Sequence, residues 1–154
     1  MTLRIEEGGL DDPQVQALLG IHLAKARAAT AEGFAFALDL SGLKVPGIRF
    51  FTAWEGGAAM GTGALKRVAP DHGEVKSMHT AEGARRRGVG AAMLRHIADA
   101  ARAAGMTRLS LETGTSAYFQ PAVAMYLAHG FTPCGPFGDY AASAENRFLT
   151  LVLD

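Results

Sequence analysis

The stretch EVKSMHTAEGARRRGVGAAMLRHIADAARAAG, residues 74–105, decides the fold. Polar and apolar side chains alternate over residues 74–80, which predicts a β-strand. Residues 85–90 form a loop rich in arginine and glycine, here called the glycine-arginine loop. Apolar residues then recur at helical spacing over residues 89–104, and Gly105 is placed to end that helix. The segment therefore predicts a strand, a loop and a helix in direct succession.

The glycine-arginine loop has the features of a pyrophosphate site. A helix N-terminus exposes unpaired backbone N–H groups and a partial positive charge. Glycines such as Gly88 and Gly90 let a ligand approach those groups closely, and arginine adds bidentate phosphate donors. The alternative is that the glycines only permit a tight turn while the arginines lie in solvent. Three arginines in register with a helix start favour phosphate binding.

Three designs for binding phosphate compete for this loop. A P-loop requires a Lys-Ser or Lys-Thr pair after the glycines, and the sequence has none there. A dinucleotide-binding fingerprint fits Gly88 and Gly90 but fails at Met93. Only about 40 residues follow Glu112, too few to complete a dinucleotide-binding fold. The pattern Gln/Arg-x-x-Gly-x-Gly/Ala of coenzyme A loops is met by Arg85, Gly88 and Gly90.

The rest of the chain predicts an antiparallel group of strands followed by alternating strands and helices. The predicted strands cover residues 2–7, 48–54, 58–68, 74–80, 108–112 and 148–153, and Phe131 opens a further one. Predicted helices start at Pro13 and Pro121, and residues 28–40 are predicted to be helical as well. This order predicts a mixed α/β fold.

Length and composition bound the class of protein. The chain has 154 residues, of which 49% are hydrophobic and 19% charged, so we expect a folded single domain over residues 1–154. Basic and acidic residues number 15 each, and this zero net charge argues against a general nucleic-acid binder. No apolar run is long enough to span a bilayer, and the first residues lack a signal-peptide pattern. We therefore expect a cytoplasmic protein with no nucleic-acid or membrane partner.

Three segments resemble the GNAT superfamily of acetyl-CoA-dependent N-acetyltransferases. GEVKSMHT (73–80) is similar to the family's central strand, ARRRGVGAAML (84–94) to its pyrophosphate loop and helix, and AVAMYLAHGF (122–131) to its last motif. LETGT (111–115) and GFTPCGPFGDY (130–140) also resemble an uncharacterised bacterial branch of the family. The resemblance implies a mostly antiparallel central sheet, splayed in the middle and flanked by helices. It also implies acetyl-CoA as the acyl donor and no metal.

The resemblance further implies where the coenzyme lies. Backbone groups around Met78, His79 and Thr80 would bind the pantetheine arm. Ser116 would contact the pantetheine or adenine end. The pyrophosphate would be surrounded by Arg85, Arg86, Arg87, Gly88, Val89, Gly90 and Ala91. For Arg86 and Arg87, a solvated side chain or a contact with the 3'-phosphate stays open.

The resemblance places a catalytic tyrosine at Tyr126, five residues before Phe131. When an amine attacks a thioester, the intermediate expels coenzyme A thiolate, and a phenol within hydrogen-bond reach can protonate that sulfur. The alternative is a buried aromatic ring that packs beneath the sheet, since Tyr126 lies in an apolar helix.

A base is expected as well, because an amine is almost wholly protonated at neutral pH. Glu74 and Glu112 are the candidates. Glu74 is expected to share a strand face with Met78 and Thr80, whereas His79 is expected on the opposite face. Glu112 ends the next strand, near the predicted splay. The alternatives are an ion pair for Glu74 and an acceptor of N–H groups in the following turn for Glu112.

The loop that contains Asp139 and Tyr140 is a candidate border of the acceptor pocket, since loops often carry function. Asp139 would attract a cationic amine there. The alternative is a rigid turn held by its proline and glycine.

Cys134 is the one cysteine of the chain, which excludes an internal disulfide and a multi-cysteine metal site. A buried thiol is its expected state.

The predicted function is transfer of acetyl from acetyl-CoA to a primary amine by direct attack in a ternary complex. The amine would belong to a small molecule or a peptide. The alternative function is a non-catalytic acyl-CoA-binding sensor or interaction domain with the same fold. A homodimer is expected from the habit of the family.

Overall fold

The computed structural model describes residues 2–85 and 87–154. The strands are β1 (Arg4–Glu7), β2 (Ile48–Glu55), β3 (Ala58–Ala69), β4 (His72–Thr80), β5 (Arg108–Gly114), β6 (Thr132–Pro133) and β7 (Asn146–Val152). The helices are α1 (Pro13–Ala28), α2 (Leu40–Leu43), α3 (Val89–Ala103) and α4 (Gln120–Ala128), with 3-10 turns at Glu82–Ala84 and Ala117–Phe119.

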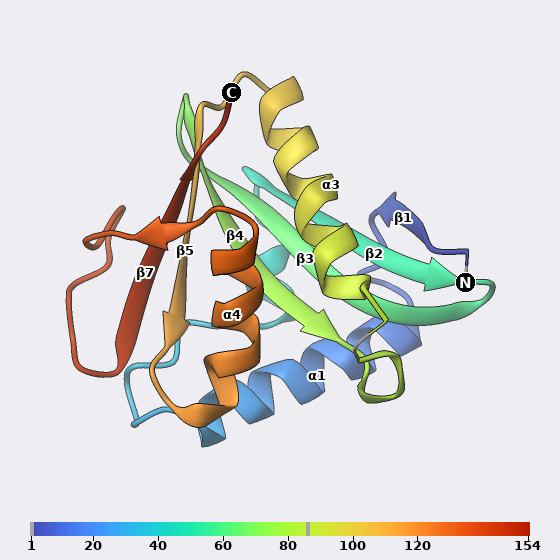
Figure 1. The fold of residues 1–154 in the computed structure, drawn as a ribbon. Helices are drawn as coiled ribbons and strands as arrows, with labels where there is room; N and C mark the ends of the chain where they lie inside the picture. The colour runs from blue at the N-terminus through green and yellow to red at the C-terminus, as the bar shows by residue number, and fades with distance from the viewer. Residues whose placement is uncertain (1, 86) are drawn as a thin grey trace.

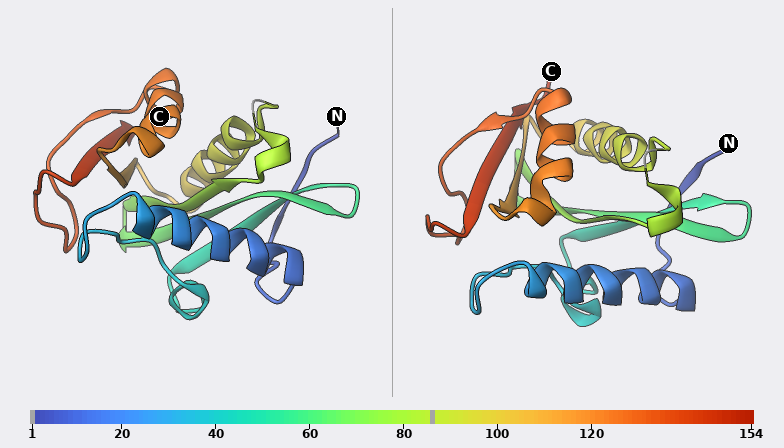
Figure 2. Two further views of the ribbon diagram at one scale, coloured as in Figure 1. Left: turned by 90° about the horizontal axis from the view of Figure 1, so that it is seen from below. Right: turned by 60° about the horizontal axis from the view of Figure 1, so that its bottom comes forward.

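The described strands form one seven-stranded sheet in the order β1-β2-β3-β4-β5-β7-β6 (Figure 1). Neighbouring strands are antiparallel except β4 and β5, which are parallel. Figure 2 shows α1 on one face of the sheet, and α3 and α4 on the other. The predicted mixed α/β fold, with a mostly antiparallel sheet flanked by helices, is confirmed.

α1 begins where the sequence places its capping signal. The Asp12 carboxylate accepts a hydrogen bond of 2.8 Å from the backbone N–H of Gln14, and Pro13 occupies the first turn. Such a cap satisfies one of the unpaired N–H groups at a helix start. The buried side chains of α1 that hold it against the sheet are Val15, Leu18, Leu19 and Ala26.

The predicted helix over residues 28–40 is wrong. α1 ends at Ala28, and the chain then runs as an irregular segment, the α1–α2 loop (residues 29–39), before the short helix α2. Gly33 has a φ of 85°, in the left-handed region that interrupts a helix. Apolar residues of this loop pack against distant parts of the chain instead of forming a helix face. Phe36 contacts Tyr140, and Leu38 packs in the cluster that holds α1. Local pattern does not reveal such contacts.

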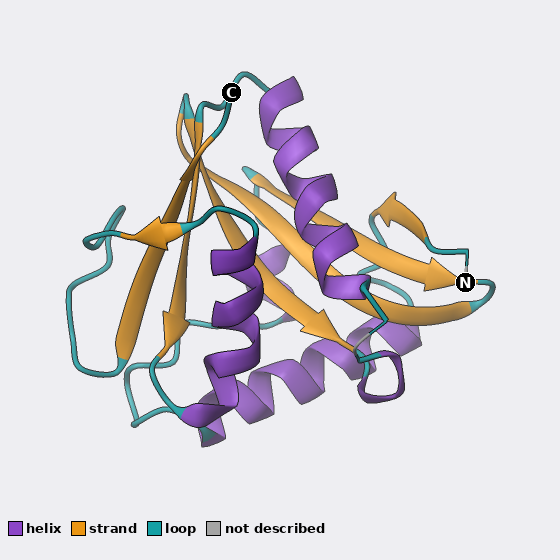
Figure 3. Ribbon diagram, viewed as in Figure 1, coloured by secondary structure: helices purple, strands orange, loops and turns teal. Residues whose placement is uncertain are grey.

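The sheet splays between β4 and β5. The two strands pair only over His72–Glu74 and Arg108–Ser110. Beyond that point they diverge, as Figure 3 shows. The predicted splay is therefore confirmed, and within residues 2–85 and 87–154 no strand pairs with the second half of β4 on its β5 side.

β4 contains a bulge at Ser77. Ser77 has a φ of 55°, in a region that residues other than glycine seldom occupy. The pairing with β3 shifts there, because Ala64 pairs with Lys76 whereas Thr62 pairs with His79. The Thr62 hydroxyl donates a hydrogen bond of 2.8 Å to the Ser77 carbonyl. The extra residue on β4 reverses the direction of the side chains beyond it.

The bulge changes which side chains share a face of β4. Glu74 and Lys76 lie on the α1 face, since the β3 residue opposite Lys76 packs in the α1 cluster. His79 lies on that face too, with its ring centroid 5.3 Å from that of an α1 histidine. Met78 packs in the core cluster that contains α3, and Thr80 points to the α3 side. The predictions that Glu74 shares a face with Met78 and Thr80, and that His79 points away from Glu74, are therefore wrong.

α3 packs very closely on β3. Its predicted apolar stripe is confirmed, because Val89, Met93 and Ile97 are at most 1% exposed. A Cβ on Gly63 of β3 would lie 2.7 Å from Met93 and 2.9 Å from Ile97. The absence of a side chain on this strand residue is what lets the helix approach.

Replacing Gly63 with alanine should lower the free energy of unfolding by about 1–3 kcal/mol, because the added methyl group overpacks the contact with α3. Unfolding in guanidinium chloride measures this change. Gly57→Ala, in the turn between β2 and β3, is the matched control, since nothing lies within 4 Å of its Cβ position. Equal stability of the two variants would contradict the account of this contact.

Candidate active site

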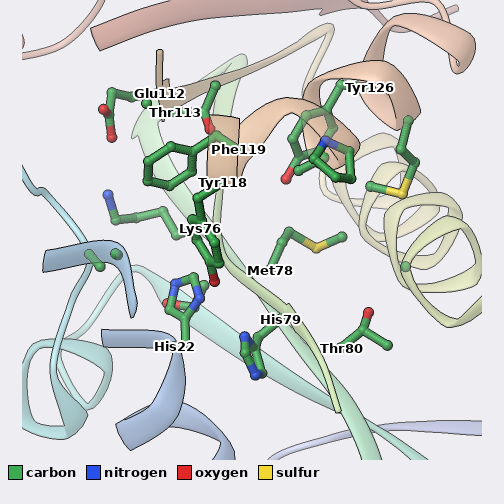
Figure 4. Close-up of a pocket in the computed structure, with 18 of the residues that line it drawn as sticks. His22, Lys76, Met78, His79, Thr80, Glu112, Thr113, Tyr118, Phe119 and Tyr126 are labelled. Atoms are coloured by element: carbon green, nitrogen blue, oxygen red, sulfur yellow. The ribbon is translucent and has the colours of Figure 1, made fainter. Parts of the chain in front are cut away.

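A cleft of about 630 Å³ opens where β4 and β5 separate (Figure 4). Its walls are the N-terminus of α3, β4 from Lys76 onward, the end of β5, the start of α4, the C-terminal half of α1 and the α1–α2 loop. Sites for small molecules usually measure about 300–1,000 Å³. The cleft is therefore large enough for an extended ligand.

One end of the cleft lies at the N-terminus of α3. Gly88 caps this helix with a φ of 80° and has no side chain that could bond to the N–H groups of the first turn. The N–H groups of that turn favour an anionic ligand, and so does the guanidinium of Arg85, which lines the same end of the cleft. The predicted coenzyme residues that line this end are Arg85, Gly88, Val89, Gly90 and Ala91.

Arg87 lies elsewhere. Its guanidinium donates hydrogen bonds of 3.0 and 3.3 Å to the carboxylate of Glu55 on β2, and it does not line the cleft. Arg86 lies outside the described residues. Of the three arginines in the glycine-arginine loop, the structure brings Arg85 to the cleft.

The middle of the cleft follows the unpaired edge of β4. Met78, His79 and Thr80 all line it. A ligand beside this edge can form the hydrogen bonds that a neighbouring strand would otherwise form. The hydroxyl of Ser77 is buried without a hydrogen-bond partner among the described residues. Burial, with smaller contributions from nearby cations, lowers the pKa of His79 to about 4, so its ring is neutral at pH 7.

Tyr126 projects from α4 into the cleft wall. The residue is 5% exposed, and its ring packs with the centroid 5.7 Å from that of Phe131. Figure 4 shows its hydroxyl end turned toward the cleft. Burial raises the pKa of Tyr126 well above its ordinary value. The phenol therefore stays protonated at neutral pH.

Glu112 lies at the opposite end of the cleft from Thr80 (Figure 4). The side-chain amide of Asn146 donates a hydrogen bond of 2.5 Å to Glu112 Oε2. Burial raises the pKa of Glu112, and the hydrogen bond from Asn146 acts in the opposite direction. Desolvation disfavours the charged carboxylate, whereas a hydrogen bond to it favours that form.

Glu74 is buried behind the cleft and does not line it. Lys76 Nζ lies 3.0 Å from Glu74 Oε2, and the Tyr140 hydroxyl donates a hydrogen bond of 2.5 Å to the same oxygen. Lys76 Nζ also donates to the Tyr140 hydroxyl at 2.8 Å. Burial and the Glu74 carboxylate raise the pKa of Tyr140. These three side chains are here called the Glu74 cluster, in which the Glu74 carboxylate neutralises the Lys76 ammonium.

Other predicted site residues lie outside the cleft. Asp139 is exposed and does not line it, and Ser116 does not line it although its hydroxyl is buried. Cys134 is half-buried, and burial raises the pKa of its thiol. The geometry does not bring Asp139 or Ser116 into the predicted roles. For Cys134 the sequence predicted a buried thiol and no catalytic role, and the residue is partly buried.

Sequence reasoning missed several residues of this site, namely His22, Phe34, Phe36 and Asn146. The first three line the cleft from α1 and the α1–α2 loop. Asn146 reaches it through Glu112. The only local signal was that Asn146 precedes a predicted strand, and no motif in the sequence links it to Glu112.

Comparison with known proteins places this geometry in a family. Residues 20–131 match the family model described as the acetyltransferase (GNAT) family. The chain belongs to the GNAT acetyltransferase family. The predicted resemblance is therefore confirmed.

Relatives of known name support the same assignment. The uncharacterised N-acetyltransferase YedL of Escherichia coli is 43% identical over 149 residues, which cover 97% of this chain and 94% of that protein. The IAA acetyltransferase of Azospirillum brasilense is 40% identical over 113 residues, 73% of this chain and 72% of that protein. The structure of N-acetylglutamate synthase from Neisseria gonorrhoeae, complexed with coenzyme A and N-acetyl-glutamate, has a TM-score of 0.78 at 20% identity. That match covers 100% of this chain and 36% of the other and shows the shared GNAT fold.

The GNAT family uses acetyl-CoA as its acetyl donor. Residues 2–85 and 87–154 contain no group of three or more His, Cys, Asp or Glu side chains that could hold a metal ion. Within the same residues, no helix is both long enough and apolar enough to cross a membrane.

Replacing Asn146 with alanine should raise the pKa of Glu112, because the hydrogen bond that favours the carboxylate is lost while the burial remains. Carbon-13 NMR of the Glu112 carboxyl group against pH measures this shift, with Glu112→Gln used to assign the signal.

Glu145→Gln is the matched control for that titration. Glu145 neighbours Asn146 in the chain but bonds to the backbone N–H of Ala31 and not to Glu112. We expect no rise in the Glu112 pKa in this variant. An unchanged or lowered pKa in Asn146→Ala would show that Asn146 does not stabilise the carboxylate.

Proposed function

We propose that this GNAT protein transfers acetyl from acetyl-CoA to a primary amine by direct attack in a ternary complex. One observation carries the proposal: a single cleft joins an anion-binding helix start, an unpaired strand edge, a protonated phenol and a half-buried carboxylate. In order along the cleft these are the α3 N-terminus, β4, Tyr126 and Glu112.

The proposed coenzyme site follows from these groups. The pyrophosphate would lie against the first turn of α3 and Arg85, where N–H groups and a guanidinium face the cleft. The pantetheine arm would run along Met78, His79 and Thr80 and bond to their backbone groups. The thioester would then lie between β4 and Tyr126, within reach of an amine held at Glu112.

The proposed chemistry uses Glu112 as the base and Tyr126 as the acid. Glu112 removes a proton from the ammonium, and the free amine forms a C–N bond with the thioester carbonyl carbon. A backbone N–H near Met78 stabilises the resulting oxyanion. The C–S bond then breaks, and Tyr126 gives its proton to the leaving thiolate. As the amide forms, its nitrogen gives up a second proton, which restores the Tyr126 phenol through solvent. Glu112 releases the first proton to solvent.

Glu112 is the stronger candidate for the base, and the reason is access. Glu112 lines the cleft, whereas Glu74 is 2% exposed and engaged by Lys76 and Tyr140. The raised pKa of Glu112 also suits a base, since proton transfer is most efficient when the pKa lies near the working pH.

Replacing Tyr126 with phenylalanine should lower kcat by about 10²-fold or more, the usual contribution of a general acid, while acetyl-CoA affinity is retained. Thiol release from acetyl-CoA measures turnover, and calorimetry measures affinity. The ring and its packing on Phe131 are preserved in this variant, so stability is a built-in control.

The same two measurements separate an enzyme from a sensor. A wild-type protein that binds acetyl-CoA but releases no thiol with any amine would be an acyl-CoA-binding domain. A Tyr126→Phe variant with undiminished kcat would exclude the phenol as the acid.

A further inference from the structure

The α1–α2 loop places two aromatic rings at the Glu112 end of the cleft. Phe34 and Phe36 both line the cleft and are each 39% exposed, which is unusual for side chains of this size. The loop is attached to the segment before β7, because the Glu145 carboxylate accepts a hydrogen bond of 3.0 Å from the backbone N–H of Ala31. The Phe36 ring centroid lies 5.3 Å from that of Tyr140. These two rings therefore form an apolar wall of the cleft, and the contacts with Glu145 and Tyr140 hold it in position.

Asn146 joins this loop to Glu112. Its amide group donates one hydrogen bond to Glu112 Oε2 and another, of 3.2 Å, to the Phe34 carbonyl. The Ser143 hydroxyl donates to Asn146 Oδ1, which fixes the orientation of the amide. Glu112 Oε2 is thus occupied, and no residue in the described part of the chain donates to Oε1. Oε1 is the oxygen left for a ligand.

The charges around the cleft limit what that ligand can be. Among its described lining residues, those with formal charge at neutral pH are Lys76, Arg85 and Glu112. Arg85 lies at the proposed pyrophosphate end, and Lys76 is already neutralised by Glu74 at 3.0 Å. Two carboxylates, Glu74 and Glu112, thus lie near one ammonium, Lys76, and a net negative charge remains among these three described groups. A ligand ammonium is attracted by that negative charge, whereas a ligand carboxylate would be repelled by the carboxylates of Glu74 and Glu112.

Resting on the proposed function, we propose that the acceptor is a small monoamine with an apolar or aromatic body and no second charge. Its ammonium hydrogen-bonds to Glu112 Oε1, and its body packs against Phe34 and Phe36. A carboxylate on the acceptor could pair only weakly with Lys76, because the Lys76 ammonium is already paired with Glu74. A second ammonium finds no second carboxylate among the described residues that line the cleft.

Matched acceptors test this class. 2-Phenylethylamine and phenylalanine share a ring and differ by a carboxylate, and hexylamine, 1,6-diaminohexane and 6-aminohexanoate differ in the charge at one end. We expect kcat/KM to be at least about tenfold higher for the singly charged amine in each set, the effect of one lost favourable interaction. Equal or better use of phenylalanine, the diamine or the aminohexanoate would overturn the proposed class.

A variant tests the apolar wall separately. Phe34→Ala should raise the KM for 2-phenylethylamine about tenfold, the effect of one lost apolar contact, with acetyl-CoA affinity unchanged. Ile21→Ala is the matched control, because Ile21 is an exposed apolar residue of α1 that does not line the cleft. Equal KM values in the two variants would overturn the placement of the acceptor body.

Equilibrium binding distinguishes failure of this inference from failure of the proposed function. Calorimetry of 2-phenylethylamine with protein saturated with coenzyme A measures acceptor affinity without turnover. Binding that is weakened in Phe34→Ala but leads to no acetylation would support the acceptor site and reject the enzyme. Acetylation of charged acceptors in preference to the monoamines would support the enzyme and reject this acceptor class. Failure of every monoamine to bind would reject the class as well.

Discussion

The bulge at Ser77 determines how the two faces of β4 are used. A serine with a φ of 55° costs on the order of 1–3 kcal/mol, so the surrounding structure must hold it in place. Pairing with β3 continues on both sides of the bulge, and the Thr62 hydroxyl bonds to the Ser77 carbonyl. As a result Met78 and Thr80 face α3, while Glu74 and Lys76 face the α1 side. One strand therefore directs side chains to both sides of the sheet beside a single cleft.

The splay between β4 and β5 and the packing of α3 complete that arrangement. β5 leaves β4 after Glu74, which leaves the following backbone groups of β4 unpaired on one side. Gly63 lets α3 lie directly on β3, so the helix N-terminus ends beside the same unpaired edge. One cleft thereby contains the backbone groups of β4, the N-terminus of α3 and the phenol of Tyr126. Much of its other lining is apolar. The low polarity of such a site strengthens each electrostatic interaction within it.

The sequence predicted the features that depend on local patterns. Gly88, Arg85 and Tyr126 stand in short motifs whose spacing follows from one strand, one loop or one helix, and the structure brings all three to one cleft. Glu112 was predicted as one of two bases, and the choice between them required knowledge of burial. The bulge at Ser77 was not predictable, because nothing in its neighbours demands a positive φ, and the alternating pattern therefore gave the wrong faces beyond it.

Long-range contacts account for the other differences. Arg87 was grouped with Arg85 by proximity in sequence, but Glu55 of a distant strand pairs with it. Phe34 lay in a predicted helix, and its loop is instead held by Asn146, which is 112 residues away in the chain. Such partners are fixed only when the whole sheet has formed, so no window of sequence contains them.

Calorimetric titration with acetyl-CoA tests the central claim, that the coenzyme binds in the cleft at the start of α3, most directly. NAD and ATP serve as controls, and Arg85→Ala is compared with Arg87→Ala. The account predicts that acetyl-CoA binds and that Arg85→Ala weakens it by about 10-fold or more, as expected for a charge-assisted hydrogen bond. Arg87→Ala should change the affinity by less than about twofold, because that guanidinium is held by Glu55 outside the cleft. Equal losses in both variants, or binding of NAD or ATP in place of acetyl-CoA, would contradict the account.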